Sequence, residues 1–131
     1  HNMATISTDI AQKIDIIIRE NNTSTINLVI TDSSGSAFDL SEYSTITFTV
    51  YDDTGVHITK TQSDGITSTA TGGAPSSDGK ITIKISVTDA SILPKTYKHK
   101  LVFVKNQVVD NVTTNIETKT WMYGKFKINN D

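Results

Sequence analysis

The chain has no cysteine and only two prolines among its 131 residues, and aromatic residues make up 7% of it. Without cysteine, neither a disulfide scaffold nor a thiolate metal site can form. No stretch approaches the ~20 consecutive apolar residues that a membrane-spanning helix needs, so we expect no membrane partner. The net charge is −2 and the lysines are scattered along the chain, which disfavours nucleic acid as a partner.

Residues suited to catalysis or metal binding are also sparse. His99 shares a strand face with Tyr97 and Leu101, so we expect a packed or half-exposed strand residue there. His57 lies near a hairpin, where we expect a solvated role. The sequence contains no H-x-H, H-E-x-x-H or nucleophile-elbow motif. The run from Asp52 to Gly55 resembles a cation loop only superficially, since the further oxygen ligands are missing, and a hairpin turn explains it better. We therefore expect no enzyme activity, no cofactor and no bound metal.

What the chain does contain is a series of short alternating runs. In 45–51, Ile46, Phe48 and Val50 alternate with threonines, and 80–87 alternates in the same way. A period of two is typical of a half-buried strand, and Phe48 is expected in the central core. Weaker runs cover 13–19, 25–31, 56–61, 97–104 and 120–128. About eight strands predict an all-β fold, an immunoglobulin-like antiparallel β-sandwich, with a small β-barrel as the alternative.

The length fits one domain. We interpret 1–12 as a tag remnant (His1-Asn2, before Met3) followed by an N-terminal arm, and 13–131 as a single β-sandwich domain. One helical turn is predicted at 88–93, before a proline. Asn106-Gln107 is expected to turn the chain, with a polar loop or an edge segment at 110–118. The segment 63–79 contains five glycines or prolines, which predicts an irregular, mobile loop with at most a short strand around Ile66.

The last strand carries the only tryptophan. Strict alternation places Met122, Phe126 and Ile128 on one face and leaves four residues on the other: Trp121, Tyr123, Lys125 and Lys127. Because Trp and Tyr dominate binding energy at interfaces, these four form a candidate interface in which the lysines are the polar rim. The alternative is that Trp121 packs under a loop or that a β-bulge turns it into the core.

Three segments resemble a known family. A turn, then D-L-[ST]-x-Y, then an alternating strand occurs here as "TDSSGSAFDLSEYSTITFTVYD". A strand, a short Asp-containing helical turn with Leu-Pro and a Tyr opening the next strand occur as "KISVTDASILPKTYKHKLVF". A G-x-F-x-[VI] strand closes the pattern at Gly124 to Ile128. Together they resemble the N-terminal domain family of phage upper baseplate proteins and related small virion domains. The departures are Lys95-Thr96, where such proteins often have Gly before the Tyr, and a longer stretch from Val109 to Thr120.

The resemblance implies a virion structural or adaptor module with an immunoglobulin-like sandwich, made in the host cytoplasm and assembled into a baseplate, tail or fibre. It implies other virion proteins as partners, a homo-oligomer, and no catalytic residues. Two alternatives remain open. One is a cell-surface immunoglobulin-like adhesin, for which Lys13 and Asn129 are a crude candidate pair for an internal isopeptide bond. The other is a carbohydrate-binding module that stacks a glycan on Trp121 and Tyr123.

Overall fold

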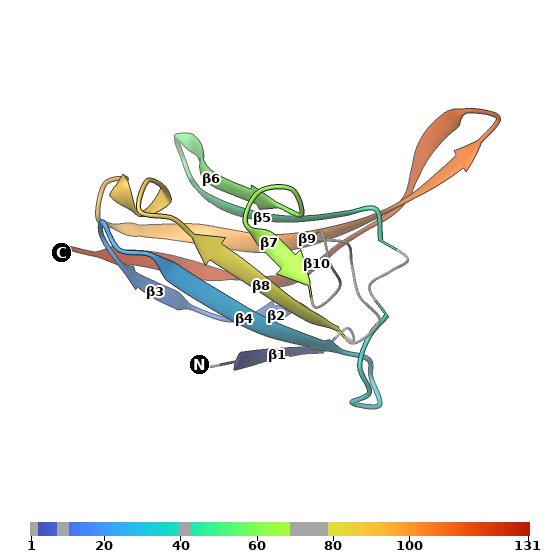
Figure 1. Ribbon diagram of the computed structural model, residues 1–131, viewed down its shortest axis with the longest axis horizontal. Helices are drawn as coiled ribbons and strands as arrows, with labels where there is room; N and C mark the ends of the chain where they lie inside the picture. Colours follow the sequence, from blue (N-terminus) through green and yellow to red (C-terminus); the bar gives the residue numbers. More distant parts are fainter. Residues whose placement is uncertain (1–2, 8–10, 40–42, 69–78) are drawn as a thin grey trace.

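In the computed structural model the described residues are 3–7, 11–39, 43–68 and 79–131, and most of them lie in β-strands (Figure 1). The strands are β1 (Met3–Ser7), β2 (Gln12–Lys13), β3 (Ile16–Arg19), β4 (Ser24–Thr31), β5 (Thr45–Asp52), β6 (Gly55–Thr61), β7 (Ile66–Ser68), β8 (Lys80–Ile85), β9 (Thr96–Val109) and β10 (Val112–Asn129). The predicted helical turn is present as the 3₁₀ turn η3 (Asp89–Ser91). Two reciprocal hydrogen bonds hold its start: the Asp89 carboxylate accepts from the Ser86 amide, and the Asp89 amide donates to Ser86 Oγ.

The strands form two sheets, which confirms the predicted all-β sandwich. The four-stranded sheet has the order β1-β4-β8-β7, and the six-stranded sheet has the order β2-β10-β9-β5-β6, with β3 also paired to β10. Within the described residues neither sheet closes on itself, so the alternative of a small barrel is wrong. Three pairs are parallel (β1 with β4, and β2 and β3 with β10), so the sheets are mixed rather than purely antiparallel. The immunoglobulin-like connectivity stays a prediction.

Apolar side chains from both sheets meet between them and form the core. Phe48 is fully buried there, as its place in the middle of an alternating strand predicts. The other largest buried side chains are Phe103, Phe126, Leu28, Ile30, Ile46, Ile66, Ile83, Ile85 and Leu101. Each of them sits at an alternate position of its strand, so the opposite face of each strand remains available to solvent or partners.

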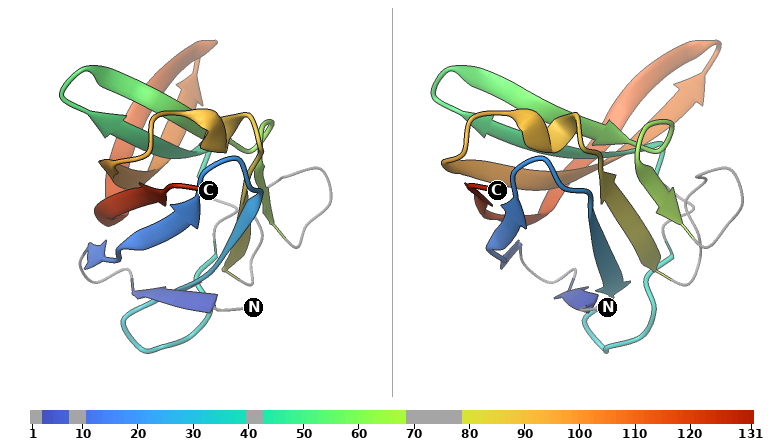
Figure 2. Two further views of the ribbon diagram at one scale, coloured as in Figure 1. Left: turned by 90° about the vertical axis from the view of Figure 1, so that its left-hand side faces the viewer. Right: turned by 60° about the vertical axis from the view of Figure 1, so that its left-hand side comes forward.

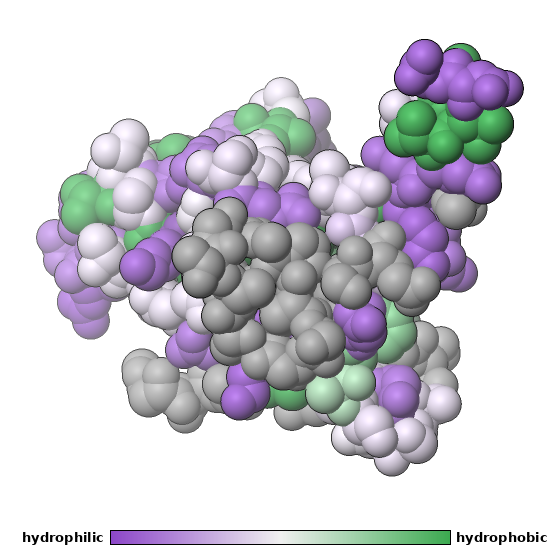
Figure 3. Space-filling model, turned by 45° about the vertical axis from the view of Figure 1, so that its right-hand side comes forward, coloured by the Kyte–Doolittle hydropathy of each residue, from purple (hydrophilic) through white to green (hydrophobic). Residues whose placement is uncertain are grey.

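The expected turn at Asn106-Gln107 is wrong. Strand β9 runs on to Val109 and the chain reverses at Asp110-Asn111. Residues 112–118 belong to β10, so the polar loop is wrong and the alternative of a strand segment describes them better. Both turn residues have positive φ, 52° and 64°, which is the geometry of a type I′ hairpin and which Asp and Asn tolerate. The β9–β10 hairpin projects beyond the sandwich (Figure 1), and its end carries an apolar patch (Figure 3) with Val108, Val109 and Val112 exposed.

The first predicted strand is interrupted. β2 and β3 are separate because Ile14 and Asp15 leave the ladder between them. Ahead of them, β1 lies beside β4 at the edge of the smaller sheet (Figure 2), so part of the expected arm is a strand. The boundary at residue 12 stays a prediction.

The chain between β6 and β8 was expected to be irregular. A short strand, β7, does occur at Ile66, whose side chain is buried. Its pairing with β8 places it at the edge of the smaller sheet. The expectation of mobility falls largely on 69–78, which lie outside the described residues.

Candidate protein interface

The structure separates the two aromatic residues of the candidate interface. Tyr123 is 43% exposed, but Trp121 is only 6% exposed and lies in the core. The cause is a register shift between Thr120 and Met122, which leaves Trp121 as the extra residue of a β-bulge on β10. Adjacent residues Trp121 and Met122 can therefore both point inward. The expectation that Trp121 shares an exposed face with Tyr123 is wrong, and the bulge alternative explains its place.

Trp121 belongs to an aromatic cluster at the end of the core. Its ring lies 4.8 Å from that of Phe103, 5.1 Å from that of Phe38 and 5.4 Å from that of Tyr43, measured between centroids. Phe38 and Tyr43 thus anchor their segment of the chain to the core through Trp121, while residues 40–42 between them are outside the described part. Because Trp121 is enclosed, it cannot form a flat glycan platform with Tyr123, so that basis for a carbohydrate-binding module is removed.

Tyr123 and Lys125 instead belong to ordered rows of side chains on the outer face of the larger sheet. Paired residues of neighbouring strands point to the same side, so the register defines each row. One row is Lys13, Tyr123, Lys100 and Thr49; the next is Lys125, Lys98 and Tyr51; a third is Ile17, Lys127 and Thr96. Neighbours within a row are about 4.8 Å apart and successive rows about 6.7 Å apart. We call this surface the lysine face.

The charge on the lysine face is strongly of one sign. All five lysines of the face are exposed: Lys13, Lys98, Lys100, Lys125 and Lys127. Arg19, the last residue of β3, points to the same side as Ile17 and is also exposed. Six of the 12 basic residues of an acidic chain therefore gather on one side of one sheet. Asp15 lies among them, its Oδ1 accepting from the Lys125 amide at 3.0 Å, and Asp53 lies near Lys98 at the β5–β6 turn. The face carries a clear positive excess.

Aromatic and apolar side chains interrupt the lysines. The Lys100 amine lies 5.4 Å from the centre of the Tyr51 ring, a cation–π contact that holds its stem against the sheet. Tyr123 lies between Lys13 and Lys100, and Ile17 is 66% exposed beside Lys127. Aromatic residues are enriched at protein interfaces and polar groups form their rim, so Tyr123 is the feature of this face that suits contact with another protein.

Sequence reasoning found Tyr123, Lys125 and Lys127 but missed the rest of this face. The other lysines come from segments about 25 and 110 residues away and form no run in the sequence. The available signal was the alternation of Lys98 and Lys100 with Tyr97, His99 and Leu101. Placing Lys98 and Lys100 beside the β10 residues requires knowledge of which strands are neighbours, and alternation within one strand does not give it.

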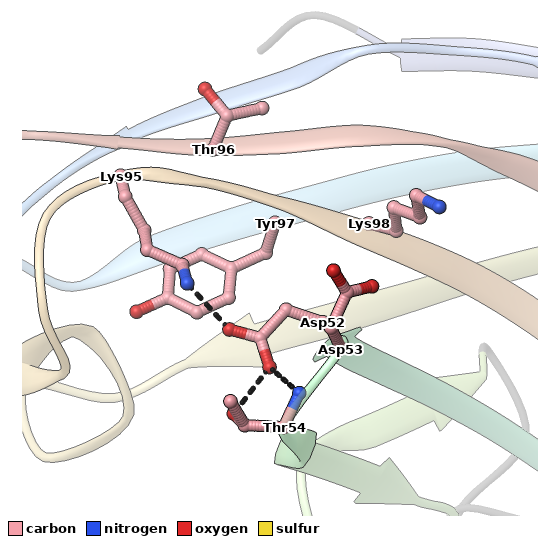
Figure 4. Close-up of a pocket in the computed structure, with 7 residues that line it drawn as sticks. All are labelled: Asp52, Asp53, Thr54, Lys95, Thr96, Tyr97 and Lys98. Carbon is pink, nitrogen blue, oxygen red and sulfur yellow. Dashed lines mark hydrogen bonds and ion pairs between the residues drawn. The ribbon is translucent and has the colours of Figure 1, made fainter.

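A polar pocket at the β5–β6 turn also gathers several titratable groups (Figure 4). Lys95 Nζ lies 2.6 Å from Asp52 Oδ2, while Asp52 Oδ1 accepts from the Thr54 amide and hydroxyl. The hydrogen bond from Lys95, then those from Thr54 and His57, hold the pKa of Asp52 far below its usual range. Asp52 is therefore a fixed carboxylate that ties the turn to the start of β9, which confirms the turn expected at this sequence.

The same pocket lacks the geometry of a catalytic relay. His57 uses one nitrogen, Nε2, for both Asp52 Oδ1 at 2.8 Å and Thr54 Oγ1 at 3.2 Å. A relay needs the base to reach the nucleophile and its orienting carboxylate through different nitrogens. Thr54 Oγ1 also lies 2.6 Å from Asp52 Oδ1, so its proton is already held by that carboxylate.

Among the residues whose burial the structure describes, two polar or charged side chains, those of Lys60 and His99, are buried. Lys60 lies on the inner side of β6 and pairs with Asp89 of η3, which joins the edge of the larger sheet to the β8–β9 connection. His99 is 1% exposed, and its Nε2 lies 2.6 Å from the carbonyl oxygen of Ile14. Burial lowers the pKa of His99, so the neutral ring with Nε2–H donating to Ile14 is the stable form. Both are structural roles, as expected for His99.

Because Gly124 has no side chain, the carbonyl group of Ile14 can come close enough to hydrogen-bond to His99. Gly124 pairs with His99 across β10 and β9, and a Cβ at Gly124 would collide with the carbonyl of Ile14. The glycine in the last strand thus marks a close approach of backbone instead of the bulge, which lies three residues earlier.

The described residues can be checked for a metal-ligand cluster, a membrane-spanning helix and a lysine placed to form an isopeptide bond. In that part of the chain no three His, Asp or Glu side chains are grouped as a metal site requires, and no helix could cross a membrane. Lys13 pairs with Tyr123 and not near Asn129, which is six residues further along β10, or about 20 Å. A lysine side chain cannot bridge that distance, so the candidate isopeptide pair is wrong.

By its fold the protein is a two-sheet β-sandwich with a projecting hairpin. Comparison with known proteins found no matching family model and no matching curated protein. Among solved structures it is similar to the N-terminal domain of phage TP901-1 ORF48, with 12% sequence identity and a TM-score of 0.59. The similarity covers 96% of this chain and 95% of that chain, so it extends over the whole fold.

Proposed function

We propose that this chain is a non-enzymatic structural or adaptor domain of a phage virion that acts through protein–protein contacts in a baseplate, tail or fibre. The observation that carries the proposal is the similarity of its fold, along nearly the full length of both chains, to the N-terminal domain of a phage protein. The sequence resemblance to phage upper baseplate proteins points to the same class of protein independently.

The three resembling segments occupy consistent places in the fold. The first runs from the end of β4 into β5, the second from β8 through η3 into β9, and the third lies in β10. They contribute core residues such as Phe48, Tyr97 and Phe126. The resemblance therefore follows the elements that build the sandwich, as expected for a shared structural domain.

Localisation in particles tests the proposal. Antibodies against this chain should label one end of the tail in purified particles of the phage that encodes it, and the chain should sediment with intact particles in a density gradient. Labelling of a host cell surface without labelling of particles would overturn the virion assignment and favour an adhesin. A particle that carries the protein only in its capsid would contradict the baseplate, tail or fibre placement.

A further inference from the structure

The lysine face is a large charged surface that no described element covers. Its rows lie on the outer side of the larger sheet, while the smaller sheet packs against the inner side through residues such as Leu101 and Phe126. At the β5–β6 side of the face, Lys100 rests on the Tyr51 ring and Lys98 lines the polar pocket. Lys125 and Lys127 of β10, together with Lys13 of β2, extend the positive surface to the other side of the sheet.

We propose that the lysine face is a docking surface for the acidic surface of a different protein, seated around Tyr123. This inference rests on the proposed function, because it names the chemistry of the partner in the assembly. Charge complementarity identifies the occupant. Six basic side chains on this face leave the remainder of a chain of net charge −2 strongly acidic, so the field of this one face differs in sign from that of the whole molecule.

The same charge argues against a second copy as the occupant in a two-fold dimer. A two-fold axis brings one patch against itself, so Lys98, Lys100 and Lys125 would face the same lysines of the other copy. Like charges that are juxtaposed in an interface cost several kcal/mol. A two-fold homodimer of this chain would have to use another surface.

The residues between the lysines favour a protein as the partner over a nucleic acid. Tyr123 supplies a large ring with few rotatable bonds, and Ile17 adds exposed apolar surface. The side chains also stand in rows across the strands of an open sheet face, whereas a nucleic-acid channel lines a groove that tracks the phosphate backbone.

Two double variants with the same change in net charge test the face. Lys98→Glu/Lys125→Glu reverses two charges in one row of the face, whereas Lys84→Glu/Lys119→Glu reverses two exposed lysines elsewhere. The probes are labelled poly-L-glutamate and duplex DNA, titrated against the whole chain at physiological ionic strength. We expect poly-L-glutamate to bind the wild type, the face variant to bind about tenfold more weakly or worse, and the control variant to change little.

Several results would overturn the inference. Tighter binding of DNA than of poly-L-glutamate would assign the face to nucleic acid, and equal losses in both variants would show a response to net charge alone. Failure of the wild type to bind poly-L-glutamate, or a dimer that dissociates only when the face is altered, would also refute it. Urea unfolding of both variants shows whether each is folded, and Lys100→Gln/Lys125→Gln replaces the face variant if it is not.

Zero-length coupling of carboxylates to amines in purified particles then tests the partner directly. We expect amide links from Lys98, Lys100 or Lys125 to Asp or Glu of another virion protein, identified by mass spectrometry. Links from Lys84 and Lys119 alone would refute the docking face while leaving the virion assignment intact. Absence of the chain from particles would refute the virion assignment, whereas the titrations on the isolated chain would still decide the chemistry of the face.

Discussion

At the scale of single residues, Trp121 and Tyr123 are two positions apart on β10, yet only the first belongs to the core. Trp121 contacts three aromatic rings, whereas Tyr123 is 43% exposed. We expect Trp121→Ala to lower the free energy of unfolding by ~3–5 kcal/mol, as Phe48→Ala should, because each leaves a large cavity. Tyr123→Ala should cost under ~1 kcal/mol. Urea unfolding curves measure all three, and similar costs for Trp121 and Tyr123 would contradict the bulge.

His99 makes stability depend on pH. Burial lowers its pKa below the ordinary 6.5, although the hydrogen bond to the Ile14 carbonyl and the charge of Asp15 act in the opposite direction. The folded state therefore takes up a proton less readily than the unfolded state does. The stabilising contribution is therefore complete above about pH 6.5 and is lost as pH falls toward the lower, folded-state pKa. His99→Gln keeps a donor for Ile14 but does not titrate.

We expect wild type to lose more unfolding free energy between pH 7 and pH 5.5 than His99→Gln does, as measured by urea unfolding at both values. Equal pH dependence in wild type and His99→Gln would refute the role of His99.

At the scale of elements, the β9–β10 hairpin depends on its two-residue turn. Beyond the sandwich it is a two-stranded ribbon, which is marginal alone in water. Asp110 and Asn111 both have positive φ, where Asn-Gly is the preferred pair. We expect Asp110→Asn/Asn111→Gly to slow amide exchange at 105–109 and 112–117, and Asn111→Val to speed it. An unchanged exchange rate in both variants would show that the turn does not limit the opening of the ribbon.

The sequence predicts the strands of this fold better than their irregularities. In β5, β8 and β9 the alternation of apolar and polar residues is strong enough to fix which face is buried. The bulges near Trp121 and at the β5–β6 pair each add one residue, and such an addition exchanges the faces of the rest of the strand without altering composition. For this reason Val56 is 60% exposed although alternation places it with the buried Ile58.

The sequence does contain a signal for the β9–β10 turn at Asp110-Asn111, although a stronger-looking signal predicts the turn at Asn106-Gln107. Asp110-Asn111, flanked by valines, carries the residues that tolerate positive φ, but the polar Asn106-Gln107 gives a competing signal four residues earlier. The lysine face was not predictable from the pattern of one strand, because it depends on parallel pairing of β2 and β3 with β10. Long-range pairing of this kind leaves no local signature.

At the scale of the whole molecule, we expect the positive lysine face to decide binding to a charged resin, even though the net charge of the chain is negative. The chain has a net charge of −2, so a uniformly charged protein of this kind would pass through a cation exchanger at pH 7. At low ionic strength fields extend about 30 Å at 0.01 M, which is enough for one positive face to orient the molecule on the resin. We therefore expect wild type to be retained and to elute as salt is raised.

In this experiment the two double variants distinguish the effect of where the charges lie from the effect of the net charge. Lys98→Glu/Lys125→Glu and Lys84→Glu/Lys119→Glu lower the net charge equally, yet only the first removes charge from the ordered rows of the larger sheet. The first should therefore flow through, whereas the second should still be retained, at a somewhat lower eluting salt concentration. If both variants elute together, the six basic residues do not act as one face, and their shared side of the sheet has no electrostatic consequence.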